Sequence, residues 1–96
     1  MIAIATKKIV PLGKLVATPS ALEAIQKANQ SFAEFVDRHR QGDWGEVDGD
    51  DWERNDESLE QGDRILSAYR TATNVRIWII TEGDRSSSCI LLPEEY

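Results

Sequence analysis

The run Val75–Thr81, which reads VRIWIIT, is the segment that most constrains the fold of this chain. β-Branched and aromatic residues fill it, and such residues are enriched in strands. Alternation along a strand divides its large side chains between two faces, with Val75, Ile77 and Ile79 on one and Trp78 and Ile80 on the other. The run therefore predicts a strand, and the neighbouring segments are interpreted around it.

Two further strands are predicted beside this one. Ile65–Ala72 precedes it, and Thr73-Asn74 fits a two-residue hairpin turn because Asn tolerates a positive φ. After a polar turn, Ser87–Leu92 forms a third strand that Pro93 ends. The C-terminal third is thus expected to be a three-stranded antiparallel meander.

Helix signals occupy the segment before the meander. Thr18-Pro19 starts one helix, and Ser31 with Glu34 forms a capping box at the start of a second, which Gly42 ends. Asp50 with Glu53 resembles another N-cap pairing, which predicts a third helix from about Asp51 to Gln61. That helix carries few apolar residues, so it is expected to pack through Trp52 and Leu59 only.

The N-terminal segment is open to several interpretations. Residues 1–8 read as a loose arm or an edge strand, and the turn-like Pro11-Leu12-Gly13 makes residues 9–17 one broken strand or a hairpin. The expected fold class is α+β, a single domain over residues 1–96. Two or three short helices pack on one face of the meander, and an extra N-terminal edge strand is an optional addition.

Charge is concentrated in one segment of the chain. Residues 1–33 carry +3, residues 34–63 carry -9 and residues 64–96 are neutral, which together give the net charge of -6. Such a block is typical of a solvated face, and it also suits a cation, a basic protein partner or mimicry of a phosphate backbone. Direct binding of nucleic acid by this segment is disfavoured, because phosphates are bound by Lys and Arg.

Four residues of the acidic segment are candidates for partner binding: Trp44, Asp48, Asp50 and Asp51. Trp44 lies between Asp43 and Gly45 in an expected loop, where it either plugs the core from outside or anchors a partner. The three Asp residues either cap a helix or form an irregular Mg²⁺ or Ca²⁺ site. The spacing does not match an EF-hand, and we expect no metal and no cofactor.

An enzymatic interpretation depends on His39, the only residue whose ordinary pKa lies near neutrality. It is either a helix C-terminal residue that contacts the helix dipole and backbone or a general acid or base. Metal-independent RNA cleavage needs a proton acceptor, a proton donor and cations for the phosphate. The candidates for these roles are His39, Tyr69 and Glu82 for proton transfer, and Arg64, Arg70 and Arg85 for the phosphate.

Several classes are excluded by composition. One Cys rules out a disulfide within the chain, and one Cys with one His cannot build a zinc site. No apolar run approaches the roughly 20 residues of a membrane span, and the N-terminus lacks the order of a signal peptide. A cytoplasmic protein that does not enter membranes is therefore expected.

Three motifs resemble a family of small uncharacterised proteins encoded on bacterial plasmids, prophages and integrative elements. They are HRQGDWG (39–45), RILSAYRT (64–71) and WIITEGDRSSSCILLPEEY (78–96). The family's closing motif typically reads like W-x-I-T-E-A-D-R-S-x-T-x-x-L-L-P-x-E-Y, from which this chain departs with Gly83 for Ala and Ser88 for Thr. The resemblance implies a setting in mobile DNA rather than a particular activity, and Gly83 is expected to loosen the turn before Asp84.

Three functional hypotheses follow. The favoured one is a small acidic accessory protein of bacterial mobile DNA that binds a protein, such as a basic host defence or DNA-processing component. The alternative is a metal-independent ribonuclease or toxin-like domain that uses His39 and the Arg residues of the meander. A homo-oligomer that pairs its last strand across an edge is the third.

Overall fold

The computed structural model describes residues 9–96 and confirms an α+β fold. Four strands, three α-helices and a terminal 3-10 turn follow one another in the order β1 (Lys14–Ala17), α1 (Pro19–Lys27), α2 (Phe32–Arg40), α3 (Gly49–Gln61), β2 (Ile65–Arg70), β3 (Arg76–Thr81), β4 (Ser87–Leu91) and η1 (Pro93–Glu95). The expected arm over residues 1–8 lies outside the described residues.

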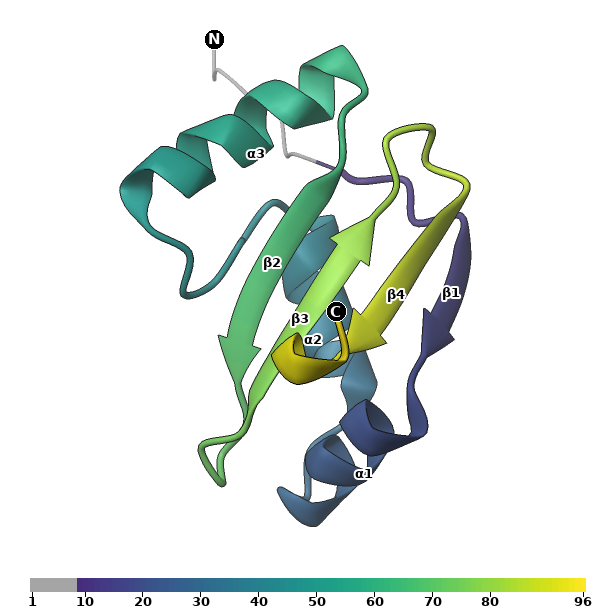
Figure 1. Cartoon of the computed structure of the whole chain (residues 1–96), viewed down its shortest axis with the longest axis vertical. Helices are drawn as coiled ribbons and strands as arrows, with labels where there is room; N and C mark the ends of the chain where they lie inside the picture. Colours follow the sequence, from purple (N-terminus) through teal and green to yellow (C-terminus); the bar gives the residue numbers. More distant parts are fainter. Residues whose placement is uncertain (1–8) are drawn as a thin grey trace, which may run out of the picture.

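The four strands form one mixed sheet in the order β1-β4-β3-β2 (Figure 1). β2, β3 and β4 pair antiparallel, as the predicted meander requires. β1 pairs parallel with β4, with Lys14 opposite Ser87. Residues 9–17 therefore contain one edge strand and no hairpin. The last strand, β4, is internal, so it cannot pair with another copy as the homo-oligomer hypothesis assumed.

The turn between β2 and β3 is longer than the two residues expected. Thr71 N–H donates to the Val75 carbonyl across Ala72, Thr73 and Asn74. Asn74 has a φ of 69°. Asn adopts this left-handed conformation more readily than most residues, which was the reason for placing a turn here.

The helices begin largely where their capping residues predict. The Thr18 hydroxyl accepts from Ala21 N–H before Pro19, and the Ser31 hydroxyl accepts from Ala33 N–H. Gly62, with a φ of 77°, ends α3. The start of α3 differs from expectation, since Asp48 and not Asp50 is its N-cap and Asp48 Oδ1 accepts from Asp51 N–H at 2.8 Å. Both Asp48 and Asp50 can act as an N-cap, and the helix begins after the earlier of the two.

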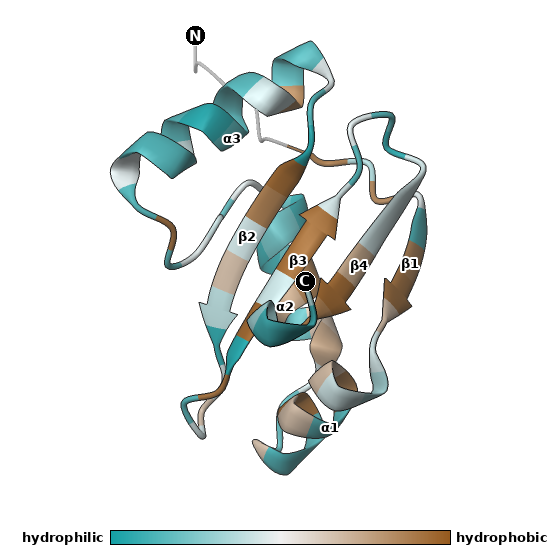
Figure 2. Cartoon of the chain, viewed as in Figure 1, coloured by the Kyte–Doolittle hydropathy of each residue, from teal (hydrophilic) through white to brown (hydrophobic). Residues whose placement is uncertain are grey.

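Helices α1 and α2 lie on one face of the sheet and form the main core with it (Figure 1). Ile25 of α1 and Phe35 of α2 pack against the side chains of alternate strand residues, which include Ile77 and Ile79 as predicted. Figure 2 shows brown, apolar stretches on the strands, whereas α3 is mostly teal. Trp78 and Ile80 point to the opposite face, on which η1 lies.

Helix α3 does not join α1 and α2 on that face but lies across the outer edge of β2 (Figure 1). Its Trp52 and Leu59, the two apolar residues expected to pack, contact a second small core built on Val10, Trp44 and Ile65. Asn55, which lies between these two residues in the helix, pairs with β2 through its side-chain amide as a neighbouring strand would through its backbone. Its Nδ2 donates to the Leu66 carbonyl at 2.8 Å and its Oδ1 accepts from Leu66 N–H at 3.2 Å.

The loop before α3 pairs with the next outward-facing backbone groups of β2. Ala68 N–H donates to the Trp44 carbonyl at 3.0 Å, and Glu46 N–H donates to the Ala68 carbonyl at 2.6 Å. Gly45 makes this approach feasible, because a side chain there would collide with the Ala68 carbonyl and the Tyr69 ring. The outer edge of β2 is thus closed by Asn55 and by residues 44–46.

We expect Asn55→Ala to lower the free energy of unfolding by about 1 to 3 kcal/mol, because it leaves the N–H and carbonyl of Leu66 without partners. Urea denaturation measures this loss. Glu57→Ala, at an exposed position of the same helix, should change stability by only about 0.5 kcal/mol or less. Equal losses in the two variants would show that Asn55 does not hold the edge.

Candidate functional site

A groove runs between α3 and the open face of the sheet. It encloses about 340 Å³, a volume within the range of small ligand sites. Its floor is formed by Leu66, Ala68 and Trp78, and its lining also includes Glu46, Val47, Asp48, Asp51, Tyr69 and Arg76. We call this hollow the α3 groove.

A second hollow of about 220 Å³ continues the α3 groove toward the C-terminal end of α3. The two share Val47, Asp51 and Leu66, and the second adds Arg54, Asn55 and Arg64. Together they form a continuous hollow along α3. The floor is apolar and the walls carry charge, as at many protein interfaces.

The acidic wall of the groove comes from the loop before α3 and from its first turn. Two of the expected binding residues, Asp48 and Asp51, line the groove, whereas Asp50 is exposed outside it. Glu46 joins them and pairs with Arg70 at 3.0 Å, and Asp51 pairs with Arg54 at 3.8 Å. Acidic residues are favourable at this helix end because the N-terminus of a helix carries partial positive charge.

Arg76 supplies a cation at the other side of the groove. It is exposed at the start of β3 and forms no ion pair with any of residues 9–96. An occupant of the groove would therefore meet carboxylates on the α3 side and a guanidinium beside Trp78.

Trp44 is not available to a partner, which corrects one of the two interpretations given above. Its side chain is 0% exposed, and Nε1 donates to Asp56 Oδ1 at 3.0 Å. The indole meets the His39 ring edge-on, with centroids 5.7 Å apart. Trp44 therefore fills the core. Its backbone is paired with β2, and this pairing holds the residue against the sheet.

Trp78 is the aromatic residue of the groove, and the sequence interpretation did not select it. Its half-buried ring meets Tyr96 edge-on at 5.8 Å. The signal was present in the strand alternation, which placed Trp78 on the face opposite Ile77 and Ile79. Because α1 and α2 cover the Ile face and not the Trp face, the Trp78 ring stays partly accessible beside η1.

His39 lies inside the protein, 0% exposed, in a network of hydroxyl groups. Its Nδ1 lies 2.5 Å from Ser67 Oγ of β2, and its Nε2 lies 2.7 Å from Thr81 Oγ1 of β3. Thr81 Oγ1 in turn lies 2.7 Å from Ser88 Oγ of β4, which donates to the Leu12 carbonyl. The ring thus links α2 to three strands.

Both ring nitrogens of His39 are occupied, so its role here is to satisfy buried polar groups. Burial, with a smaller contribution from the nearby Arg85 cation, lowers the pKa of His39 to about 4. The imidazole is therefore neutral at pH 7. The expected contacts with the helix dipole and backbone are replaced by side-chain contacts from the sheet.

The other candidates for RNA cleavage lie at separate places. Tyr69 is buried, donates to the Asp43 carbonyl at 2.5 Å and stacks under the Arg38 guanidinium at 4.6 Å. Burial raises the pKa of the Tyr69 hydroxyl well above its usual range. Arg70 is held by Glu46 and Asn74.

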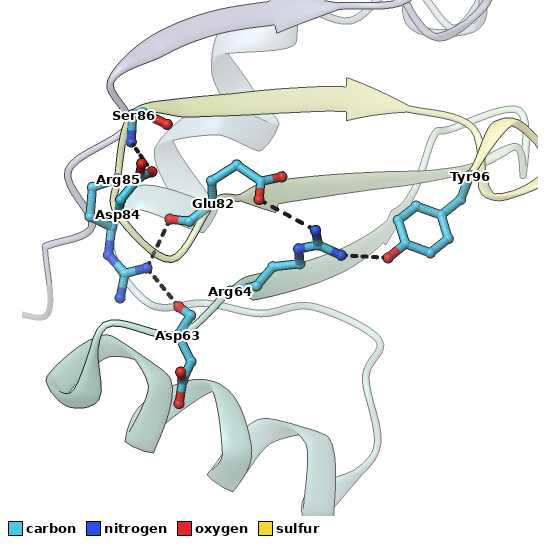
Figure 3. A network of polar contacts seen from close by, with 7 residues as sticks. All are labelled: Asp63, Arg64, Glu82, Asp84, Arg85, Ser86 and Tyr96. Atoms are coloured by element: carbon cyan, nitrogen blue, oxygen red, sulfur yellow. Dashed lines mark hydrogen bonds and ion pairs between the residues drawn. The ribbon is translucent and has the colours of Figure 1, made fainter.

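Figure 3 shows how Arg64, Glu82 and Arg85 are engaged. Arg64 donates to the Tyr96 hydroxyl at 2.6 Å and to Glu82 at 3.4 Å, on the exposed face. Arg85 donates to the carbonyls of Ser58, Asp63 and Glu82, which ties the β3–β4 turn to the end of α3. The structure therefore does not gather His39, Tyr69, Glu82, Arg64 and Arg85 around one accessible point.

Gly83 has a packing role in this turn. A Cβ at position 83 would lie 2.7 Å from the Gly62 carbonyl oxygen, which is too close for a side chain. Instead of loosening the turn as expected, Gly83 lets it approach the end of α3.

Comparisons with protein-family models, with curated proteins and with solved structures found no match to this chain. Within residues 9–96, no group of three or more His, Cys, Asp or Glu side chains is placed to hold a metal ion. None of the helices in the same residues has the length and apolar character needed to cross a bilayer.

The burial of His39 predicts a loss of stability in acid. The unfolded chain takes up a proton near pH 6.5 and the folded chain only near pH 4, so stability is full above pH 6.5 and falls as the pH drops toward 4. The loss attributable to His39 is about 3 kcal/mol.

Urea denaturation at pH 7 and pH 4.5 measures this effect. His39→Gln keeps hydrogen-bonding groups at the site without a group that titrates, so the fall in stability between the two pH values should be clearly smaller than in the wild type. Carboxylates titrate in both proteins and cancel in the comparison. Identical pH profiles would contradict the buried neutral imidazole.

Proposed function

We propose that this chain is a cytoplasmic protein-binding module, a small acidic accessory protein of bacterial mobile DNA. Its partner is a protein with a basic segment, such as a host defence or DNA-processing component. The observation that carries the proposal is the α3 groove, in which Asp48 and Asp51 stand beside an apolar floor that includes Trp78. The genomic setting is supported only by the resemblance of the three motifs described above.

The groove is suited to an extended segment that carries Lys or Arg next to an apolar residue. The apolar side chain would cover Leu66 and Ala68, and the cation would lie between the carboxylates and the Trp78 ring. Aromatic rings attract cations over their faces, and carboxylates add charge-assisted hydrogen bonds. Arg76 would donate hydrogen bonds to a carboxylate or carbonyl group of the same segment.

The charge distribution supports a basic partner as well. Residues 34–63 carry -9 of charge, and α3 displays six acids against Arg54 alone. A surface of one sign steers a partner of opposite sign into contact and raises the rate of association. Most of these carboxylates are exposed, so the contribution should decrease as salt increases.

Capture from a bacterial host that carries the gene, followed by identification of the bound protein and titration with it, tests this proposal. We expect Asp48→Asn with Asp51→Asn to weaken binding by about tenfold and to reduce its salt dependence. Asn caps helices about as well as Asp, so α3 should remain intact.

The matched control is Glu53→Gln with Glu57→Gln, which removes the same charge from exposed positions of α3 outside the groove. Its affinity should stay close to that of the wild type. If both double variants lose affinity equally, the net charge and not the groove determines binding. If neither loses affinity, the partner binds elsewhere.

A further inference from the structure

The strand β1 offers a free edge for backbone pairing. Lys14 N–H donates to the Ser86 carbonyl at 3.0 Å and Thr18 N–H donates to the Ile90 carbonyl at 2.9 Å, so the even-numbered residues face β4. Because backbone groups alternate along a strand, the N–H and carbonyl groups of Leu15 and Ala17 point away from the sheet. No residue among 9–96 pairs with them.

The opposite edge of the sheet, formed by β2, is already covered by other parts of the chain. There, Asn55 pairs with Leu66, and residues 44–46 pair with Ala68, so the outward groups of these two β2 residues already have partners. Exposed strand edges are usually blunted by charge, proline or a covering element. Of these devices β1 has only Lys14, at its first position, which leaves an edge suited to another strand.

Exposed apolar side chains surround this free edge. Leu15 is 38%, Val16 40% and Phe32 46% exposed, although each is a residue that normally buries surface. They line a hollow of about 240 Å³ together with Ala17, Leu22 and Ile90. A strand added at β1 would therefore find both backbone partners and an apolar surface.

We propose that a second copy of this chain occupies the edge, so that β1 pairs antiparallel with β1 of the other copy. The charge distribution favours this occupant. The acidic helix α3 lies at the far edge of the sheet from β1 (Figure 1), so a dimer through β1 keeps the two acidic helices apart. The strand sequence KLVA contributes a single charge, that of Lys14.

The register proposed for the pair is the one that uses all four outward backbone groups of each β1 strand. Leu15 of one copy pairs with Ala17 of the other, which forms four N–H to carbonyl bonds, and the two-fold axis passes beside Val16. The two Val16 side chains then face each other on the open side of the sheet. Each Lys14 lies opposite Thr18, so the two lysines are about 13 Å apart, four strand residues at roughly 3.3 Å each.

The mass in solution, measured by light scattering across a wide concentration range, provides the first test. We expect twice the 10.8 kDa of one chain at high concentration. Ala17→Pro removes one outward N–H but no bond to β4, so it should return the mass to that of one chain while a thermal melt confirms folding. Ala17→Ser keeps the N–H and should stay dimeric.

A second pair of variants keeps the test decisive if Ala17→Pro fails to fold. Val16→Lys places two like charges face to face at the axis and should abolish the dimer. Ile9→Lys makes a similar change at a residue that is 65% exposed outside the strand, and it should remain dimeric.

Cysteine crosslinking tests the register. The background is Cys89→Ser, because Cys89 lies opposite Val16 in β4 and would capture a nearby thiol within one chain. Under mild oxidation Val16→Cys should form a covalent dimer, since paired strand residues lie within disulfide range. Lys14→Cys, on the same side of the strand, should not.

The proposal would be overturned by a single-chain mass at every concentration. It would also be overturned by a dimer that persists in Ala17→Pro or crosslinks as readily through Lys14→Cys as through Val16→Cys. These measurements do not involve the α3 groove, so their outcome is independent of the protein partner proposed above.

Discussion

The pairing at the outer edge of β2 determines where the acidic part of the chain lies. A helix with few apolar residues has little surface to bury, so hydrophobic packing alone would hold α3 weakly. The amide of Asn55 and the backbone of residues 44–46 hold it instead, through bonds to Leu66 and Ala68. Because the helix is fixed beside the edge and not on the helical face, a groove remains between it and Trp78.

Buried polar groups and charged groups are separated in this protein: the former are neutral and lie inside, and the latter lie at the surface. The network of His39, Ser67, Thr81 and Ser88 contains neutral groups only, and each of these side chains has a hydrogen-bond partner within it. The carboxylates stay at the surface, and several of them pair with arginines. Charge is thus concentrated where a partner can reach it, while the buried network that links α2 to the sheet consists of hydroxyl groups and one imidazole.

Local sequence patterns predicted much of the fold. Alternation in β3 assigned Ile77 and Ile79 to the core and Trp78 and Ile80 to the other face, and capping chemistry placed the starts of α1 and α2. These features depend on neighbours within a few residues. The partners of His39 are 28 and 42 positions away, and those of Trp44 include the backbone of Ala68, so no short window contains them.

Only part of the candidate site was predicted, because local patterns reveal charge but not contacts between residues distant in the sequence. Asp48 and Asp51 were selected because charge density is visible in the sequence, and both line the groove. Of the two interpretations of Trp44, the core plug was right and the partner anchor was wrong, because its Asp and Gly neighbours suggest solvent whereas its burial depends on pairing with β2. Trp78 could have been chosen by asking which face of the strand the helices leave uncovered.

The parallel pair of β1 and β4 has a consequence for the order of folding. Its partners are far apart in the sequence, since Lys14 lies opposite Ser87, whereas β2, β3 and β4 are joined by short turns. Closing a long loop costs more chain entropy than closing a short one, so the meander can form first and β1 can dock onto it afterwards. In the single chain, the same strand should be the first of the four to detach in hydrogen exchange, which would uncover the edge of β4.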